Sequence, residues 1–246
     1  MNKFAGKTVI IAALFYSSIS FCSALDDESS ALRIKCISNI ESIRTVKFSA
    51  VTNIEPAVAI NKAQVRVAPA GSDAVTWDRK GIKCKWKRSG SGASGYVVDA
   101  VNGTLSYLGP DSASVFVEDI PVSDALEKSV PSPRWLWNPS WLIPEKPASV
   151  RKENGIVIIT TSNGNPKREI RMEAGTGHLL GFTDTDAKGN TVRVVEVKEW
   201  VEYNGVWLPG SVREEIRGSK GILVRNTILT VSAVNDILGA TDFVLP

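Results

Sequence analysis

The sequence shows no clear catalytic or metal-binding pattern. His178 is the only histidine, which excludes a histidine-rich zinc site and leaves a Ser-His-Asp arrangement with a single candidate base. Gly177 and Leu179 flank it at the start of an apolar strand pattern, which favours a structural role. We therefore predict no catalytic residue, no metal ligand and no cofactor, and we predict that the protein is not an enzyme.

An acidic pattern near residue 186 resembles the start of a calcium loop. Asp184 and Asp186 have the right spacing, but Lys188 and Val195 stand where such a loop requires oxygen ligands. The pattern is therefore predicted to form a hairpin turn.

Glu214 and Glu215 form the second acidic pattern. They are neighbours on a predicted strand, so they should point to opposite faces and cannot share acid–base work.

The segment from Gly90 to Gly95 matches the dinucleotide-binding pattern G-x-G-x-x-G in form only. In that motif the last glycine leads into a helix whose N-terminus holds the pyrophosphate, whereas Tyr96-Val97-Val98 is typical of a strand. A hairpin loop is the prediction.

Two cysteines, Cys36 and Cys84, follow the first 24 residues, and each falls on the apolar side of its predicted element. Export to an oxidising compartment would favour a disulfide between them. Two buried free thiols are the alternative, because cysteine is a common core residue.

The strongest local pattern lies between His178 and Ile216 and predicts two consecutive β-hairpins. The first turns near Gly189, and the second turns at Asn204-Gly205, a pair that type I′ turns prefer. The alternation of apolar and charged residues slips between Val194 and Val195, which predicts a β-bulge and a curved sheet.

The rest of the chain predicts one amphipathic helix and further antiparallel strands. Apolar residues at Leu32, Cys36, Ile40 and Ile43 give the helix an apolar stripe that must lie on a sheet. A turn is expected at 69–73 and a short helix at 123–129. The predicted strands are 45–52, 62–67, 82–87, a meander from 97 to 119, 150–153, 156–161, 167–173 and 222–234.

The segment from Pro131 to Pro147 is unusually apolar for a loop. Its five prolines argue against regular structure, yet it holds three of the seven tryptophans. One interpretation is a plug that folds inward and fills the core of the sheet. The other is a lid at the rim of a hydrophobic cavity. The candidate cavity or lid residues are Trp86, Trp135, Leu136, Trp137, Trp141 and Leu142.

Residues 1–24 have the pattern of a secretory signal peptide, with Lys3 and Lys7 before an apolar run and small residues before the expected cleavage site after Ala24. Lipidation at Cys22 is the less favoured alternative, because Phe21 precedes it. Residues 25–246 are then expected to form one domain in the periplasm of a Gram-negative-type bacterium. Their charge is close to neutral, which argues against nucleic-acid binding.

Short motifs across most of the chain resemble the periplasmic lipoprotein carriers and outer-membrane sorting proteins of the lipoprotein-localisation (Lol) system. They are the strand from Gly81 to Trp86, the hairpin around Gly103-Thr104-Leu105, the stretch from Tyr203 to Pro209, and the ending from Phe243 to Pro246. Ala100 departs from the pattern, because the hairpin of those proteins has glycine there.

The resemblance implies an α+β fold that is mostly antiparallel β: an incomplete β-barrel whose concave apolar face is covered by an N-terminal helix and loops. It also implies non-enzymatic binding of the acyl chains of lipid or lipoprotein, for transport or sorting to the outer membrane, by a monomer that meets an inner- or outer-membrane partner protein. The alternative is an envelope sensor or scaffold whose cavity is filled by its own side chains. A 131–147 segment packed solidly into the concave face would favour that alternative.

Overall fold

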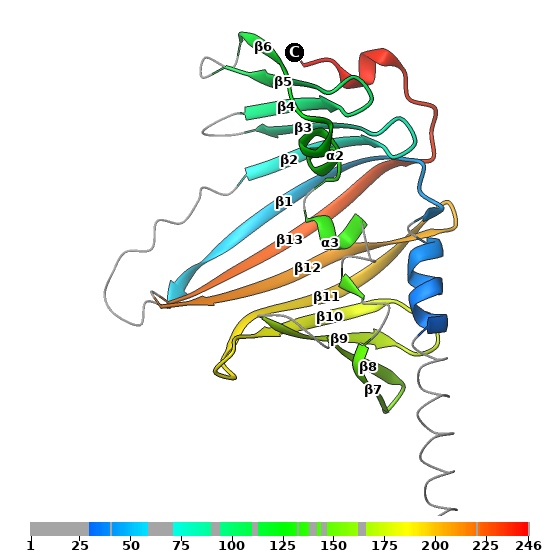
Figure 1. The fold of residues 1–246 in the computed structure, drawn as a ribbon, viewed down its shortest axis with the longest axis vertical. Helices are drawn as coiled ribbons and strands as arrows, with labels where there is room; N and C mark the ends of the chain where they lie inside the picture. The colour runs from blue at the N-terminus through cyan, green and yellow to red at the C-terminus, as the bar shows by residue number, and fades with distance from the viewer. Residues whose placement is uncertain are drawn as a thin grey trace, which may run out of the picture.

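Antiparallel strands dominate the computed structural model of the chain (Figure 1). The structure describes residues 30–39, 41–58, 71–89, 94–109, 113–131, 133–137, 142–143, 147–161, 166–219 and 221–245. The predicted signal peptide, residues 1–24, and Trp141 lie outside these ranges. No helix of the described part is long and apolar enough to cross a membrane.

Within the described residues, thirteen strands form one sheet in the order β6-β5-β4-β3-β2-β1-β13-β12-β11-β10-β9-β8-β7, and every neighbouring pair is antiparallel. β6 and β7 are the two edges, so the sheet is open. The strands are β1 (Thr45–Val58), β2 (Gly71–Asp78), β3 (Lys83–Ser89), β4 (Ser94–Asp99), β5 (Thr104–Leu108), β6 (Val115–Asp119), β7 (Pro147–Glu153), β8 (Ile156–Thr161), β9 (Lys167–Glu173), β10 (Leu179–Thr185), β11 (Thr191–Tyr203), β12 (Val206–Gly218) and β13 (Gly221–Val234). The predicted incomplete, mostly antiparallel barrel is confirmed.

The helices lie along one end of the sheet and over its concave face (Figure 1). The N-terminal helix, residues 30–39, lies beside the ends of β9 to β12; its Asn39 amide donates to the carbonyl of Trp207 at 2.7 Å. The short helices α2 (Val122–Lys128) and α3 (Arg134–Trp137) cross the concave side. A final 3₁₀ turn, η1 (Ala240–Phe243), is tied to β1 by the ion pair Lys47–Asp242.

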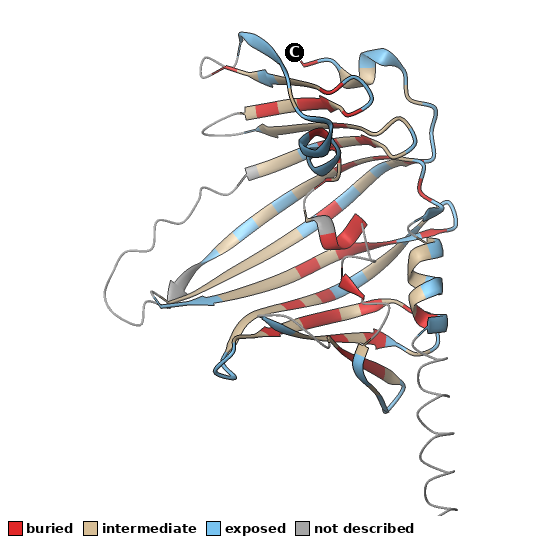
Figure 2. Ribbon diagram, viewed as in Figure 1, coloured by how far each residue is buried: buried red, intermediate tan, exposed pale blue. Residues whose placement is uncertain are grey.

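The core has two parts on the concave face. The larger part joins the N-terminal helix and α3 to β1, β2, β3 and the strands from β8 to β13, and Figure 2 shows many buried positions on these elements. The smaller part consists of Val98, Ala100 and Ala125, where α2 packs on β4.

Both predicted hairpins are confirmed, and the turn residues explain them. Asn204 and Gly205 have φ of 50° and 79°, as a type I′ turn requires. In the first turn the Asp186 carboxylate accepts hydrogen bonds from the backbone N–H groups of Lys188 and Asn190, as predicted for a turn rather than a calcium loop.

The predicted position of the bulge is wrong. Val194 and Val195 pair regularly with both neighbouring strands, and the register of β11 with β12 shifts between Val197 and Trp200 instead. Pro209, which pairs with Trp200, has no N–H to donate to the ladder, and the indole of Trp200 donates to the carbonyl of Leu179 at 3.1 Å.

Two further predictions, those for 69–73 and for the 131–147 segment, need correction. The expected turn at 69–73 is partly strand, because Gly71, Ser72 and Asp73 pair with β1 and begin β2. The expected strand 62–67 lies outside the described residues. The 131–147 segment contains one regular turn, α3, whose Leu136 N–H donates to the carbonyl of Pro133.

Candidate functional site

The 131–147 segment packs into the concave face. Trp135, Leu136, Trp137 and Leu142 are each no more than 4% exposed and belong to the larger core. These are four of the candidate cavity or lid residues, and in this structure they fill part of the face.

The two tryptophans of α3 contact strands from opposite halves of the sheet. Trp137 stacks on Phe48 of β1, with ring centroids 5.0 Å apart, and lies 5.6 Å from Trp77 of β2. Trp135 meets the ring of Phe182 on β10 edge to face at 5.6 Å. Such aromatic pairs add to the burial energy, so α3 joins the two halves.

One polar atom of this packed segment is left without a partner. The indole Nε1 of Trp137 is buried and has no hydrogen bond within the described residues. An unmade hydrogen bond of this kind costs about 1–3 kcal/mol. The side chains of α3 are therefore well packed, but the indole N–H of Trp137 lacks a hydrogen-bond acceptor among the described residues.

Trp86, the remaining candidate among the described residues, lies between the two parts of the core. It is half-buried on β3, packs against the larger core, and stacks on Tyr96 of the smaller one at 5.5 Å. Two cavities of the concave face open on either side of it.

The first cavity has a volume of about 270 Å³ and lies over β12, β13, β1, β2 and β3. Phe48, Val75 and Leu229 line its apolar part, together with Trp86 and Pro133. Asp73, Arg88, Glu214 and Arg225 supply charged groups.

The second cavity has a volume of about 460 Å³ and lies over β3, β4 and β5. Tyr96, Leu105, Tyr107 and Leu108 line it, and Lys128 and Val130 close it from the end of α2. Trp86 lines both cavities, so they share a wall.

A row of alternating charges crosses the concave face from β9 to β13. Arg168 forms a bidentate pair with Asp184 at 2.6 and 2.8 Å, and both side chains are nearly buried. Glu214 pairs with Arg193 at 2.6 Å and with Arg225 at 3.6 Å. The guanidinium groups of Arg168 and Arg193 lie 4.6 and 5.2 Å from the ring centroid of Phe182.

The sequence interpretation missed this row, although a signal for it was present. Asp184 stands two residues from the core residue Phe182, Arg193 two from Val195, and Glu214 two from Val212, so each charge is in phase with the apolar face. Arg225 stands four residues before Leu229, in the same phase.

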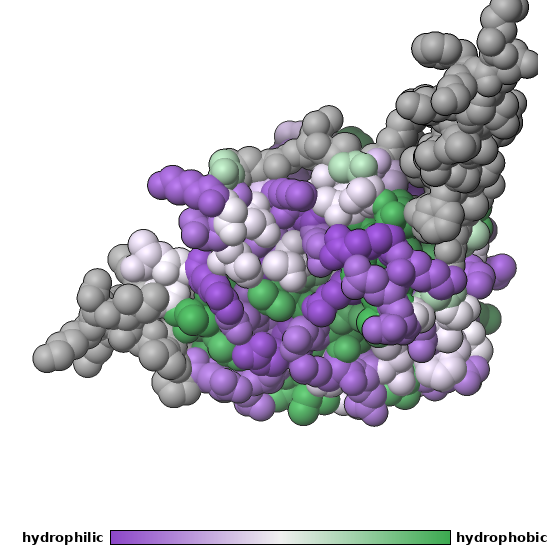
Figure 3. Space-filling view, turned by 90° about the horizontal axis from the view of Figure 1, so that it is seen from below, coloured by the Kyte–Doolittle hydropathy of each residue, from purple (hydrophilic) through white to green (hydrophobic). Residues whose placement is uncertain are grey.

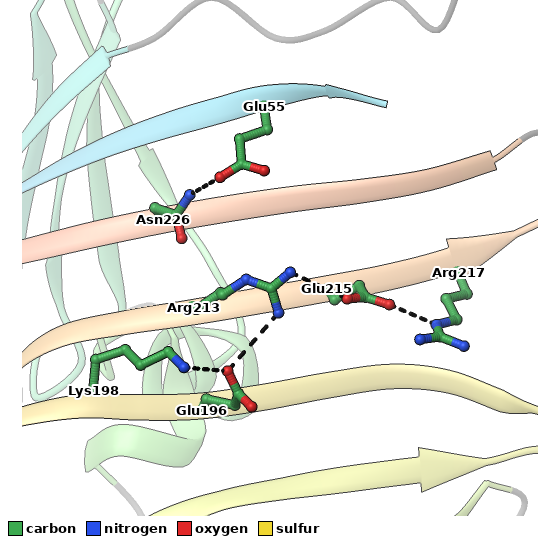
Figure 4. A network of polar contacts seen from close by, with 7 residues as sticks. All are labelled: Glu55, Glu196, Lys198, Arg213, Glu215, Arg217 and Asn226. Carbon is green, nitrogen blue, oxygen red and sulfur yellow. Dashed lines mark hydrogen bonds and ion pairs between the residues drawn. The ribbon is translucent and has the colours of Figure 1, made fainter. Parts of the chain in front are cut away.

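The opposite, convex face carries its own network, shown in Figure 4. Arg213 pairs with Glu215 at 3.3 Å and with Glu196 at 3.8 Å, and Asn226 donates to Glu55 at 2.7 Å. Glu214 and Glu215 therefore face opposite sides of β12, as predicted.

Both cysteines are free thiols in different surroundings. Cys36 lies on the N-terminal helix beside His178 and Trp200, whereas Cys84 of β3 pairs with Trp77 and Val98. Burial raises the pKa of Cys36 to about 11 and that of Cys84 to about 12, so neither is a reactive thiolate at neutral pH. In this structure Cys36 and Cys84 are thus two free thiols, the alternative to the disulfide.

His178 has a packing role. Its ring stacks on Trp200 with centroids 4.6 Å apart, and burial lowers its pKa below 6.5, while Glu173 opposes that shift. Among the described residues, no group of three or more His, Cys, Asp or Glu side chains could hold a metal ion.

Solved structures of known proteins share this architecture. A DUF1329 family protein from Desulfovibrio piger aligns with 90% of this chain and 96% of its own, at 12% identity and a TM-score of 0.53. A LolA superfamily protein from Nitrosomonas europaea aligns with 85% of this chain and 96% of its own, at 9% identity and a TM-score of 0.50. The fold is of the Lol type.

A third similar structure is an outer-membrane lipoprotein-sorting protein domain from Vibrio parahaemolyticus, at 10% identity and a TM-score of 0.48, covering 87% of this chain and 97% of its own. No family model matches the sequence, and no curated protein matches it. At these identities the Lol-type likeness describes the fold.

Proposed function

We propose that this protein binds acyl chains of lipid or lipoprotein on the concave face of its sheet, without enzymatic activity, in the cell envelope. The observation that carries the proposal is the pair of cavities that meet at Trp86. Their volumes, about 270 and 460 Å³, lie around the lower end of the range of small-molecule sites.

The energetics of such a site favour long chains. Each buried methylene contributes about 0.8 kcal/mol, so a chain needs few polar contacts to bind. Trp86, Tyr96 and Leu105 offer the apolar surface. The chain could extend from one cavity to the other only if Trp86 turned aside, because that side chain forms their shared wall.

The fold supports the same assignment. One similar structure bears the name LolA superfamily. Transport or sorting of lipoprotein in the periplasm is the role that the resemblance of the sequence to the Lol system implies. Residues 1–24, as a signal peptide, would export the chain to that compartment. A monomer that passes its cargo to a membrane partner protein completes the proposal.

Native mass spectrometry of delipidated protein, re-exposed to fatty acid, phospholipid and an acylated peptide, tests acyl binding. Ala50 lines the first cavity, so Ala50→Phe should fill it and reduce uptake by about tenfold. Ala74 is exposed on the neighbouring strand, outside both cavities, so Ala74→Phe is the matched control. No adduct with any of the ligands would contradict acyl binding.

A second candidate is a protein-interaction module, a sensor or scaffold on the same fold. The packing of Trp135 and Trp137 into the concave face favours it, because a self-filled face leaves less room for cargo. The same experiment separates the two candidates: protein that takes up no acyl ligand, yet is folded, would support the interaction module.

A further inference from the structure

The first cavity has one apolar end and one charged end. Phe48, Val75 and Leu229 lie at the apolar end, and Glu214 and Arg225 lie at the other. Along β1 the cavity is lined from Phe48 through Thr52 to Ile54, which pairs with Arg225, so apolar surface extends to the charged end. A site with this polarity suits a molecule that has an apolar chain and a polar end group.

The charged end carries an excess of positive charge. In the row from β9 to β13, three arginines meet two carboxylates: Arg168 is matched by Asp184, while Arg193 and Arg225 share Glu214. Glu214 lies much closer to Arg193, at 2.6 Å, than to Arg225, at 3.6 Å. The charge of Arg225 is thus the least compensated of the three.

Arg225 is also the most accessible of these arginines. Its side chain is 42% exposed, against 26% for Arg193 and 14% for Arg168, and it lines the cavity. A guanidinium has five N–H donors in a planar fork that matches carboxylate and phosphate oxygens. The other arginine of the cavity, Arg88, is already held by Asp73 at 2.8 and 3.0 Å.

We propose that the first cavity binds an acyl chain that ends in an anionic group, a carboxylate or a phosphate, and that Arg225 contacts this group. The inference rests on the proposed function and adds the charge of the ligand to it. Neutral chains of the same length would enter the same apolar end but would gain nothing from Arg225.

Three ligands with one chain and different ends test the proposal: dodecanoic acid, dodecyl phosphate and dodecanol, with inorganic phosphate as a fourth. Calorimetric titration at neutral pH should give tighter binding of at least one anionic ligand than of dodecanol, by about tenfold. The two acids distinguish a carboxylate site from a phosphate site, and inorganic phosphate distinguishes a free-anion site from one that needs the chain.

Arg225→Gln should remove the preference for the anionic ligand and leave the binding of dodecanol unchanged. Arg213→Gln is the matched control, since Arg213 lies in the convex network of Figure 4 and should keep the preference. Equal binding of all three chains by the unaltered protein, or a preference that survives in Arg225→Gln, would overturn this inference alone. Failure of every chain to bind would overturn the proposed function as well.

Discussion

At the scale of single residues, His178 shows how one side chain can be rare and yet structural. Its imidazole lies between Trp200 and Trp207, with centroids 4.6 and 5.1 Å away. Burial in this contact disfavours the charged imidazolium, because it removes water from the ring. The neutral ring is therefore part of the contact between the N-terminal helix and the strands.

This arrangement predicts a histidine pKa below 6.5 in the folded protein, lowered mainly by burial. Because the folded pKa is lowered, the contribution of His178 to stability is present above about pH 6.5 and is lost as the pH falls from there through the folded pKa. A proton NMR titration can measure the value directly, since no other histidine exists. Glu173→Gln should lower it further, because that carboxylate favours the imidazolium.

Glu118→Gln serves as the control for this titration, since Glu118 is exposed on β6 at the far edge of the sheet. It should leave the histidine pKa unchanged. A pKa at or above 6.5 in the unaltered protein would contradict the packing role.

At the scale of elements, β10 depends on a glycine. Gly181 has φ of 151°, and a Cβ there would lie 2.1 Å from the carbonyl oxygen of Val195 on the neighbouring strand. The register of β10 with β9 also shifts between Leu179 and Gly181. Only glycine lets the two backbones approach so closely.

Gly181→Ala should therefore lower the free energy of unfolding by about 3 kcal/mol, through backbone strain and the clash with β11. Urea unfolding followed by circular dichroism measures it. The control is Gly175→Ala, where a Cβ meets nothing within 4 Å and the change should be small or slightly stabilising. Equal effects of the two substitutions would show that the close approach does not constrain β10.

The two edge strands differ in how they meet solvent. β7 carries Arg151, Lys152 and Glu153, charged residues that discourage pairing with another chain, and Figure 3 shows hydrophilic side chains interleaved with hydrophobic ones on the described part of the face seen from below. β6 instead exposes Val115, Phe116 and Val117. The β6 edge is thus the less protected one, which agrees with the interaction module as the second candidate.

The sequence predicts elements best where turn chemistry and alternation agree. Asn204-Gly205 and the alternation of Cys84 and Trp86 identify their hairpin and strand correctly, because both signals are local. Ile82, which the same alternation places in the strand, precedes β3 and has φ of 50°. Gly71 to Asp73 misled the prediction, since pairing with β1 on one side and β3 on the other overrides a turn-rich composition. The contacts of Trp137 with Phe48 and Trp77 join residues that are far apart in the chain, so the local sequence pattern could not predict them.

At the scale of the whole molecule, α3 joins the two halves of the open, curved sheet across its concave face. Trp135 and Trp137 connect β10 with β1 and β2 across the concave face, and α2 covers the remaining strands near β4. The two parts of the core meet at Trp86 and Tyr96. Whether they unfold together decides whether residues 25–246 behave as one domain.

The two cysteines compare the N-terminal helix with β3: both belong to the larger part of the core, and Cys84 pairs with Val98 of the smaller part. Burial and raised pKa values protect both thiols in the folded protein. In a Cys22→Ser background, with Cys36→Ala or Cys84→Ala leaving one thiol at a time, both should become reactive toward dithionitrobenzoate at the same urea concentration. Reaction of the two thiols at clearly different urea concentrations would show two unfolding units. Protein that keeps both cysteines and is prepared without reductant tests the disulfide: the absence of free thiols after unfolding would show that the disulfide forms.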